Sequence, residues 1–424
     1  MPLLLLLGLL PVLLRPTMGT VCLWLLAVVV LTLVDWALAP RPDGLSLTRR
    51  PLGTVRIGQP TETVLAATNG SGRAMRARVR DAWQPTAGAS GNRHRIRLSR
   101  DERTLLRTPL LPRRRGDLQA VGVTVRVAGP LGLASRQATR QVPGVVRALP
   151  PFDSRKHLPS RLARLRDLDG RSAIRVRGQG TEFDSLREYV RGDDVRSIDW
   201  RATARTPGVV VRTWQPERDR RVVLVLDTSR VSAGRVDDVP RLDSAMDAAL
   251  LLAALAARAG DRVDFLAGDR RVRSRRRSAG GRDVAHHLQE AMADLEPVIA
   301  EADWSALAGA VTGLGRRHAL VVLLTPLEPS AVEEGLLPVL PTLTRRHRVV
   351  LASVRDPALD RLASSREDVA QVYDAAAAEQ VLLRRRRTAE LLRALGVHVV
   401  DTDAERLPPA LADHYLDLKA HGLL

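Results

Sequence analysis

The sequence contains little cysteine, little lysine and few aromatic residues. Cys22 is the only cysteine among 424 residues, which excludes a disulfide framework within the chain and any CxxC metal site. Lys156 and Lys419 are the only lysines, so arginine supplies nearly all of the 66 basic residues behind the formal net charge of +19. This skew is typical of a GC-rich genome. The charge is therefore interpreted as a solvated, arginine-rich surface rather than a nucleic-acid site, with a polyanion partner as the alternative.

The N-terminus is the most apolar part of the chain. Residues 18–38 carry one charge, Asp35 near the end, and are long enough to cross the hydrocarbon of a bilayer as a helix. Residues 3–14 are also apolar but are shorter and contain Pro11, so one or two helices could span the membrane. A signal peptide is the alternative for this first run, although no basic region precedes it and no AxA pattern follows it.

The distribution of arginines around these segments predicts an orientation. Arg41, Arg49, Arg50 and Arg56 follow the second segment, whereas Arg15 is the only basic residue between the two. Basic residues collect on the cytoplasmic side of a membrane. We therefore expect a protein of the cell membrane, anchored in the lipid bilayer by residues 1–40, with everything after them in the cytoplasm.

Between residues 41 and 150 the hydrophobic period changes to short alternating runs. Examples are residues 61–67, 77–81 and 120–127, separated by turns rich in glycine, proline and asparagine. This pattern predicts a small β-sandwich. No cluster with metal-ligand spacing occurs there, so the interpretation is a spacer or docking module.

Residues 151–215 are expected to be a linker followed by an unusual polar segment. Residues 178–205 read GQGTEFDSLREYVRGDDVRSIDWRATAR, which is too polar for a buried strand yet contains three aromatic residues. The initial glycines resemble a kinase glycine-rich loop, but the lysine, HRD and DFG elements of a kinase do not follow. Carboxylates interspersed with arginines favour an ion-pair network over acid–base catalysis. Ile198 and Trp200 alternate around Asp199 as in a half-buried strand, which predicts that Trp200 is a buried anchor.

This segment resembles the signature of an uncharacterised bacterial family, domain of unknown function 58, written GxGxEFxxLREYxxGDDxRxIDWxxxAR. The resemblance extends to the N-terminal hydrophobic segments, the β-rich middle and the C-terminal half. It implies a von Willebrand factor A-like domain and an association with MoxR-type AAA+ ATPases in complex assembly. The signature residues are Gly178, Gly180, Glu182, Phe183, Arg187, Tyr189, Gly192, Asp193, Asp194, Arg196, Asp199, Trp200 and Arg205.

Residues 216–424 independently predict an α/β domain with a doubly wound, mostly parallel sheet. Continuous apolar strands at residues 222–226, 262–266, 319–324 and 349–354 alternate with amphipathic helices. The run of four arginines at 384–387 is expected to be a solvated face of one such helix.

A candidate metal site follows the first of these strands. Von Willebrand A domains hold Mg²⁺ there with DxSxS, and this chain has Asp227 and Ser229 but Val231 in the third position. Thr325 stands where a second acidic ligand is often found, and Glu328 is the nearest carboxylate. The motif is incomplete, so the expectation is no cofactor, with Mg²⁺ as the alternative.

No catalytic residues are expected. The sequence contains no GxSxG elbow and no HExxH helix. The function predicted is that of a non-enzymatic, membrane-anchored scaffold that presents its von Willebrand A-like domain to a protein partner, a MoxR-type ATPase. A Mg²⁺-dependent adhesion domain and a polyanion-binding protein are the alternatives.

Overall fold

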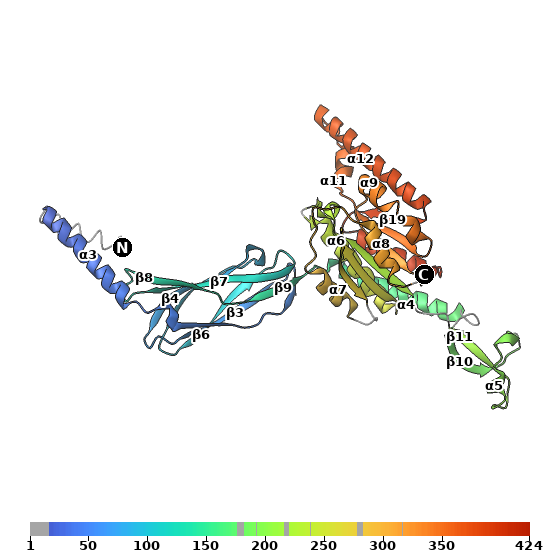
Figure 1. Cartoon of the computed structure of the whole chain (residues 1–424), viewed down its shortest axis with the longest axis horizontal. Coiled ribbons are helices and arrows are strands. Elements are labelled where there is room, and N and C mark those ends of the chain that lie inside the picture. The colour runs from blue at the N-terminus through green and yellow to red at the C-terminus, as the bar shows by residue number, and fades with distance from the viewer. Residues whose placement is uncertain are drawn as a thin grey trace. The chain divides into compact units, whose positions relative to one another are not determined.

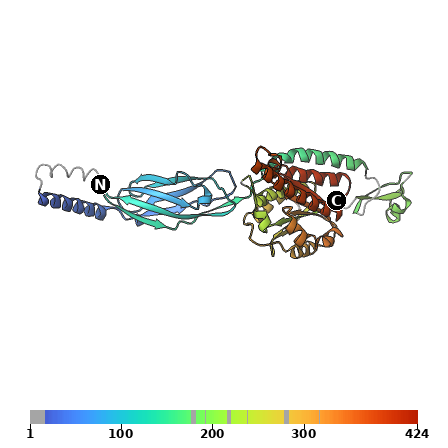
Figure 2. The same ribbon diagram turned by 90° about the horizontal axis from the view of Figure 1, so that it is seen from above.

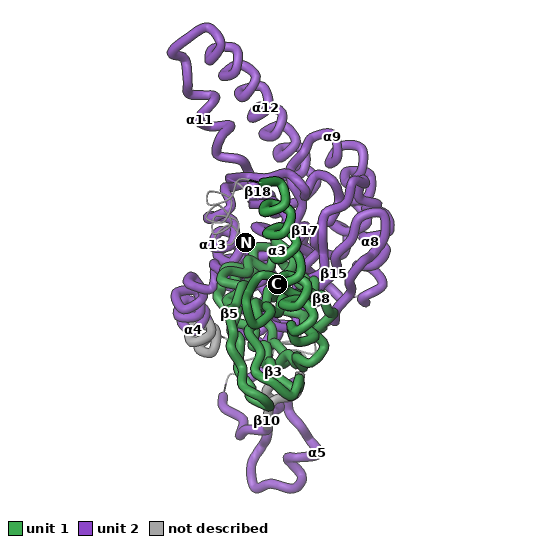
Figure 3. The backbone as a smooth tube through the Cα atoms, turned by 90° about the vertical axis from the view of Figure 1, so that its left-hand side faces the viewer, with its two compact units in different colours: residues 1–149 green, residues 150–424 purple. Residues whose placement is uncertain are grey.

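The computed structural model describes residues 17–175, 182–191, 193–215, 220–237, 239–277, 283–315 and 317–424. The chain divides into two compact units, residues 1–149 and 150–424, coloured separately in Figure 3. Each unit has its own hydrophobic core and is described by itself.

Unit 1 begins with a long apolar helix, α3 (Met18–Leu38), as the sequence predicts. The Thr17 side chain caps it by accepting a hydrogen bond from the amide of Thr20. Leucine and valine side chains are exposed along most of its length, and the helix is long and apolar enough to span a membrane. The first apolar run, residues 3–14, lies outside the described residues.

The rest of unit 1 is a sandwich of two mostly antiparallel sheets, whose strands run along the length of the sandwich (Figure 2). Strand β4 shows why they form, because Met75, Ala77 and Val79 are buried while the intervening arginines are exposed. A buried ion pair of 2.7 Å between Arg49 and Asp81 joins the sheets. One sheet contains β1 (Leu45–Arg49), β3 (Thr61–Asn69) and β6 (Arg103–Leu110); the other contains β2 (Thr54–Arg56), β9 (Val145–Leu149), β7 (Gly116–Ala128), β4 (Met75–Trp83) and β5 (Arg93–Leu98), with β8 (Ser135–Arg140) paired to β7.

Unit 2 is built on a six-stranded sheet in the order β16-β15-β12-β17-β18-β19. Five strands are parallel, and β16 is an antiparallel edge strand that the apolar runs of the sequence do not predict. The central strands are buried on both faces and consequently read as uninterrupted apolar runs. The strands are β12 (Arg221–Asp227), β15 (Arg262–Gly268), β16 (Val272–Arg277), β17 (Leu320–Leu324), β18 (Arg348–Val354) and β19 (Val397–Thr402).

Helices cover both faces of this sheet (Figure 1). Alternate residues of β12 enter different cores: Leu224 packs with one helical layer and Val225 with the other. The first layer contains α4 (Leu158–Arg175), α6 (Arg241–Arg258), α7 (Val284–Met292) and α13 (Leu407–Ala420); the second contains α8 (Trp304–Thr312), α10 (Leu340–Thr344) and the end of α12 (Val369–Ala394), which also packs against α11 (Ala358–Ser364).

Helix α4 corrects one expectation, because part of the supposed linker belongs to the α/β unit. Leu165 is buried in the core, and Leu158 and Leu162 pack against it at helical spacing. Arg161 also pairs with Asp413 of α13 at 2.9 Å. The amphipathic stripe therefore makes this segment a helix of the domain.

Candidate functional site at the strand ends and the signature hairpin

The carboxyl ends of β12 and β17 bring the first candidate residues together, as expected for a parallel sheet. Asp227 ends β12 and is buried. The Thr325 hydroxyl donates to Asp227 Oδ2 at 2.7 Å, and the Ser229 amide donates to Asp227 Oδ1 at 2.7 Å. Burial raises the pKa of Asp227 above its usual range, although these hydrogen bonds oppose the shift.

Ser229 lies next to this carboxyl group in a pocket of about 430 Å³. Its side chain is buried, and its hydroxyl oxygen has no hydrogen-bond partner among the described residues. Asp227, Thr325 and Val231 line the same pocket. The predicted motif and Thr325 therefore contribute one carboxylate and two hydroxyls to this pocket, and Val231 supplies no oxygen donor, as the incomplete motif implies.

Those donors fit a divalent cation only in part. Mg²⁺ prefers about six oxygen ligands, so water would have to supply most of them. Within the described part of the chain, no group of three or more histidine, cysteine, aspartate or glutamate side chains could hold a metal ion.

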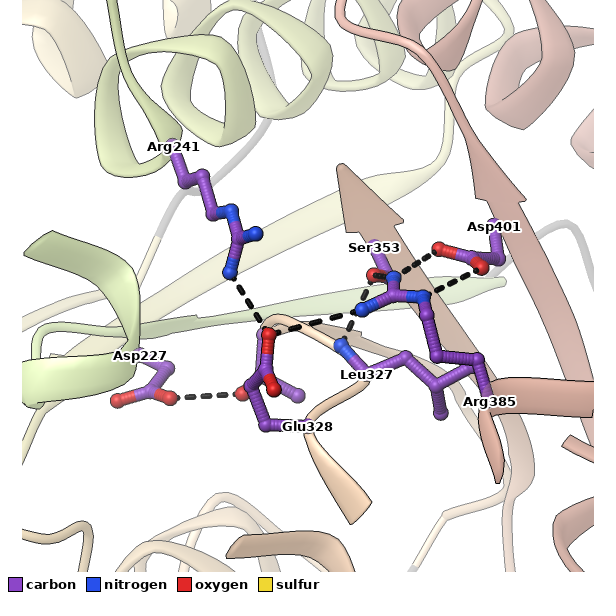
Figure 4. A network of polar contacts seen from close by, with 8 residues as sticks. Asp227, Arg241, Leu327, Glu328, Ser353, Arg385 and Asp401 are labelled. Atoms are coloured by element: carbon purple, nitrogen blue, oxygen red, sulfur yellow. Dashed lines mark hydrogen bonds and ion pairs between the residues drawn. The ribbon is translucent and has the colours of Figure 1, made fainter. Parts of the chain in front are cut away.

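Glu328 has different partners from those of a metal ligand. Arg241 Nη1 donates to Glu328 Oε1 at 2.9 Å, and Arg385 Nη1 lies 3.6 Å from the same oxygen (Figure 4). Arg385 Nη2 also donates to Asp401 Oδ1 at 2.7 Å and to Ser353 Oγ at 3.2 Å. Two guanidinium groups thus neutralise the carboxylate that could otherwise complete a cation site.

Arg385 corrects a second expectation, because only 3% of this residue is exposed. Arg384, Arg386 and Arg387 are exposed, as predicted for a solvated face. Thr388, Ala389 and Leu392 are buried on the same helix, and Arg385 shares their stripe at spacings of three, four and seven residues. That stripe was the sequence signal that could have identified Arg385 as buried.

The second candidate is the signature segment, which forms a hairpin of β10 (Glu182–Glu188) and β11 (Val210–Gln215). Between the strands lie a 3-10 turn, η4 (Val195–Ser197), and a short helix, α5 (Trp200–Thr203). Asp194 caps the first by accepting from the Arg196 amide, and Asp199 caps the second by accepting from the Arg201 and Ala202 amides.

Ion pairs hold this hairpin together. Arg187 donates to both carboxylate oxygens of Asp193, at 2.8 and 2.6 Å, and Arg212 donates to Asp199 at 2.8 Å. These guanidinium groups hold the pKa of Asp193 and of Asp199 below the usual range. Among the described residues, the hydrogen bonds of the segment are internal to it, and the carboxylates of Asp193, Asp194 and Asp199 accept from cap amides and guanidinium groups.

Trp200 contradicts the anchor prediction. It begins α5 instead of continuing a strand, and 67% of it is exposed. The physical reason is Asp199, whose side chain caps a helix at the position where the alternation of Ile198 and Trp200 predicted a strand. Ile198 nevertheless pairs with Val211 in an isolated bridge.

The remaining signature residues are placed in part. Tyr189 donates its amide to the Val209 carbonyl at 2.8 Å, and the Arg205 amide donates to the Ala202 carbonyl at 2.9 Å. Glu182 and Phe183 lie in β10, opposite residues 215 and 214. Gly178, Gly180 and Gly192 fall outside the described residues.

Most of the two candidate sites lies in a region shared with a known protein family. The family model "Protein of unknown function DUF58" matches residues 185–409, more than half of the chain. The chain belongs to this family. The match includes the described hairpin from residue 185 onward, the sheet and the first three residues of α13, so it covers the strand-end site and nearly all of the described hairpin.

Curated relatives and solved structures add little about function. An uncharacterized protein of Mycobacterium tuberculosis is 27% identical over 189 residues, which is 43% of this chain and 57% of the relative. The chain thus spans little more than half the length of that relative, and an uncharacterized protein of Mycobacterium bovis matches to the same extent. Among solved structures, the CARDB domain of a Pyrococcus furiosus protein is 13% identical, with a TM-score of 0.19, covering 27% of this chain and 91% of that domain.

Proposed function

We propose that this protein is a membrane-anchored, non-enzymatic scaffold that presents its α/β domain and signature hairpin to a protein partner. The partner we propose is a MoxR-type AAA+ ATPase, which the family resemblance implies. The α/β domain would have the von Willebrand factor A-like fold. Support for that fold comes from the parallel sheet with one antiparallel edge strand, and from Asp227, Ser229 and Thr325 at its carboxyl edge.

The main support for the proposal is that the hairpin is held rigid by its own contacts and yet exposes large apolar side chains. Its own caps and ion pairs fix the backbone, so little conformational entropy would be lost on binding. Trp200, Val190 and Val195 are nevertheless exposed. Tryptophan is the residue type most enriched at energetic hot spots of protein interfaces. A preorganised loop with an exposed tryptophan is suited to protein recognition.

The strand-end site supports a role without catalysis. Asp227 is bound by a hydroxyl and an amide, while Glu328 and Asp401 are bound by guanidinium groups. A general base must be free to reach a substrate proton. We therefore assign this network to holding the ends of β12, β17, β18 and β19 in register for a partner.

Membrane anchoring by α3, with the remainder in the cytoplasm, completes the proposal. A reporter fused after Leu424 tests the orientation. Activity of a cytoplasmic reporter is expected from the arginine excess that follows α3, and activity of an extracytoplasmic reporter would overturn it.

Photo-crosslinking tests the partner. A photoreactive phenylalanine analogue replaces Trp200 in the full chain, and cross-linked products are identified by mass spectrometry from native membranes. We expect a MoxR-type ATPase. The matched control places the same analogue at Tyr373, which is 74% exposed on α12. Identical products from both positions, or none from Trp200, would contradict the proposal.

One observation favours a second candidate, a Mg²⁺-dependent adhesion domain. The buried hydroxyl of Ser229 has no hydrogen-bond partner within the described part of the chain and lines the pocket beside Asp227, as a ligand for a hydrated cation would. Calorimetric titration of the full chain with Mg²⁺ decides between the two. Micromolar binding that Asp227→Ala abolishes would establish the second candidate and displace a metal-free scaffold.

A further inference from the structure

One face of the sandwich in unit 1 carries closely spaced arginines, and Asp117, the exposed acidic residue at the far end of β7, pairs with Arg147 instead of with them. On β4 and β5 every second residue is an exposed arginine, and β7 adds one more. We call this set the arginine face. Its members are Arg76, Arg78, Arg80, Arg93, Arg95, Arg97 and Arg126.

The strand register places these like charges directly opposite one another. Arg78 lies between Arg95 on β5 and Arg126 on β7, and the same β4–β5 pairing sets two further arginine pairs opposite each other. Directly opposed like charges destabilise a sheet. The two further pairs are Arg76 with Arg97 and Arg80 with Arg93.

No carboxylate relieves this repulsion within the described residues of unit 1, where none of the seven arginines forms an ion pair. Asp81, the carboxylate on β4, points into the sandwich and binds Arg49. Arg126 donates to the Ser135 hydroxyl, which is neutral. The fold therefore holds a flat array of guanidinium donors whose charge is not balanced internally.

Protection of an exposed sheet edge does not account for this array. Charged residues on an edge strand prevent pairing with another chain. That role requires charge on β5, which is an edge strand, whereas the arginines continue across β4 and β7 in the interior of the sheet.

The array begins beside the end of the apolar helix. Asp35 of α3 accepts hydrogen bonds from the amides of Leu131, Leu133 and Ala134, in the turn between β7 and β8. Arg126 lies on β7 only a few residues before that turn. Arg136, just after the turn, stacks on Trp36 of α3 with its guanidinium carbon 4.5 Å from the ring centroid. The sandwich is thus fixed to the point where α3 would leave the bilayer.

We propose that the arginine face binds anionic lipid headgroups of the membrane that α3 crosses. The proposal rests on the membrane anchoring assigned above and extends it with a lipid-specific surface. Guanidinium groups recognise phosphate by paired hydrogen bonds, and clustered basic residues near a membrane helix bind anionic leaflets. Among polyanions, the headgroup layer is favoured because Asp35 tethers the face beside it. Leu131, 58% exposed at the tip of the same turn, adds an apolar contact at that level.

Fluorescence quenching in vesicles tests this surface on the full chain. Gln137 is exposed and lies opposite Arg126, so a fluorophore attached through Gln137→Cys in a Cys22→Ser background reports from the face. The protein is reconstituted into phosphatidylcholine vesicles or into an equal mixture of phosphatidylcholine and phosphatidylglycerol. Both contain a trace of lipid with a quencher on its headgroup.

We expect quenching to rise at least about twofold with phosphatidylglycerol, as expected for basic residues near an anionic leaflet. It should fall when salt is raised from about 0.1 M to about 1 M, which shortens the screening length from about 10 Å to about 3 Å. The triple variant Arg78→Gln, Arg95→Gln, Arg126→Gln should lose the phosphatidylglycerol effect. The matched control, Arg103→Gln, Arg107→Gln, Arg113→Gln, removes the same charge from exposed positions elsewhere in unit 1 and should retain it.

Flotation with the vesicles separates failure of this proposal from failure of the anchor. If the protein does not float with either vesicle, α3 does not anchor it and the underlying assignment fails. If it floats but quenching is independent of phosphatidylglycerol, or the triple variant behaves as the wild type, the lipid-binding face is refuted. Loss of quenching on addition of duplex DNA at physiological salt would also overturn it, in favour of a nucleic-acid surface.

Discussion

Asp35 and Gly129 lie so close together that no side chain fits at residue 129. A Cβ atom on Gly129 would lie 2.3 Å from Oδ1 of Asp35 and 2.5 Å from its backbone oxygen. The glycine is required by this contact and not by its backbone angles, because it is not among the glycines with positive φ. The end of α3 and the turn between β7 and β8 therefore interlock.

Gly129→Ala should disrupt this joint. Overpacking typically costs about 1–3 kcal/mol, and here the obstructing atoms include backbone. In the wild type, the amides of Leu131, Leu133 and Ala134 donate hydrogen bonds to the Asp35 carboxylate. Hydrogen exchange measured on the full chain should therefore be faster at these three amides in the variant. Gly53→Ala is the control, since nothing lies within 4 Å of a Cβ at that position. Unchanged exchange in Gly129→Ala would show that the interlock is not rigid.

Arg385 should contribute more to stability than its exposed neighbour Arg386. Arg385→Met leaves Asp401 without its guanidinium partner in a largely buried setting, and removing one member of a buried pair costs about 3–5 kcal/mol. Arg386→Met removes only an exposed contact to Glu379 at 3.7 Å, and surface pairs are worth about 0–1 kcal/mol. Urea denaturation of both variants measures the difference. Equal midpoints would contradict the structural role assigned to this network.

Sequence reasoning predicted the elements better than the polar contacts between them. The bounds of α3 and the buried strands β12 and β17 follow from continuous apolar runs, whose burial is set by local composition. The partners of Glu328 could not be predicted in this way. Arg241 and Arg385 lie far from it in sequence and reach it only because two helices begin or pass at the same edge of the sheet.

Trp200 shows why local patterns fail at the signature. Ile198 and Trp200 satisfy the alternation of a strand, but the Asp199 carboxylate can accept from the amides that follow it and thereby starts a helix instead. Both outcomes are compatible with the sequence. The side-chain cap favours the helix over the strand, and the hydrophobic periodicity of a sequence gives no information about capping.

Asp247 should make the stability of unit 2 depend on pH. Burial raises the pKa of Asp247 to about 6, although Ser154 donates its hydroxyl to the carboxylate at 2.8 Å. Between the ordinary aspartate pKa of about 4 and pH 6, the folded state holds a proton that the unfolded state has lost. The contribution of this group to stability is therefore lost as pH rises through that window.

Asp247→Asn consequently should stabilise the protein at pH 7 by roughly 1–3 kcal/mol, and by much less at pH 4, where the carboxyl group is already neutral. Asparagine retains an oxygen that can accept from Ser154. Denaturant unfolding at the two pH values gives the comparison. A variant less stable than the wild type at pH 7 would mean that the carboxylate is held by its hydrogen bonds more strongly than burial disfavours it.

Alanine substitutions at Trp200 and at Trp304 together test the role of the signature hairpin, because one tryptophan is exposed and the other is buried. Trp304 is 6% exposed in the core beside β12, whereas Trp200 is 67% exposed on α5. Trp304→Ala should lower the free energy of unfolding by about 3–5 kcal/mol, the range for deleting a buried aromatic side chain. Trp200→Ala should change it by less than about 0.5 kcal/mol, as for other surface substitutions.

If the hairpin is the partner-binding element, Trp200→Ala should nevertheless weaken binding of the cross-linked partner by about 2 kcal/mol or more, which is roughly a thirtyfold rise in Kd. Denaturant melts and a binding titration on the same preparations measure both quantities. Intact binding by a stable Trp200→Ala protein would remove the hairpin from the interface and leave the carboxyl edge of the sheet as the surface to test.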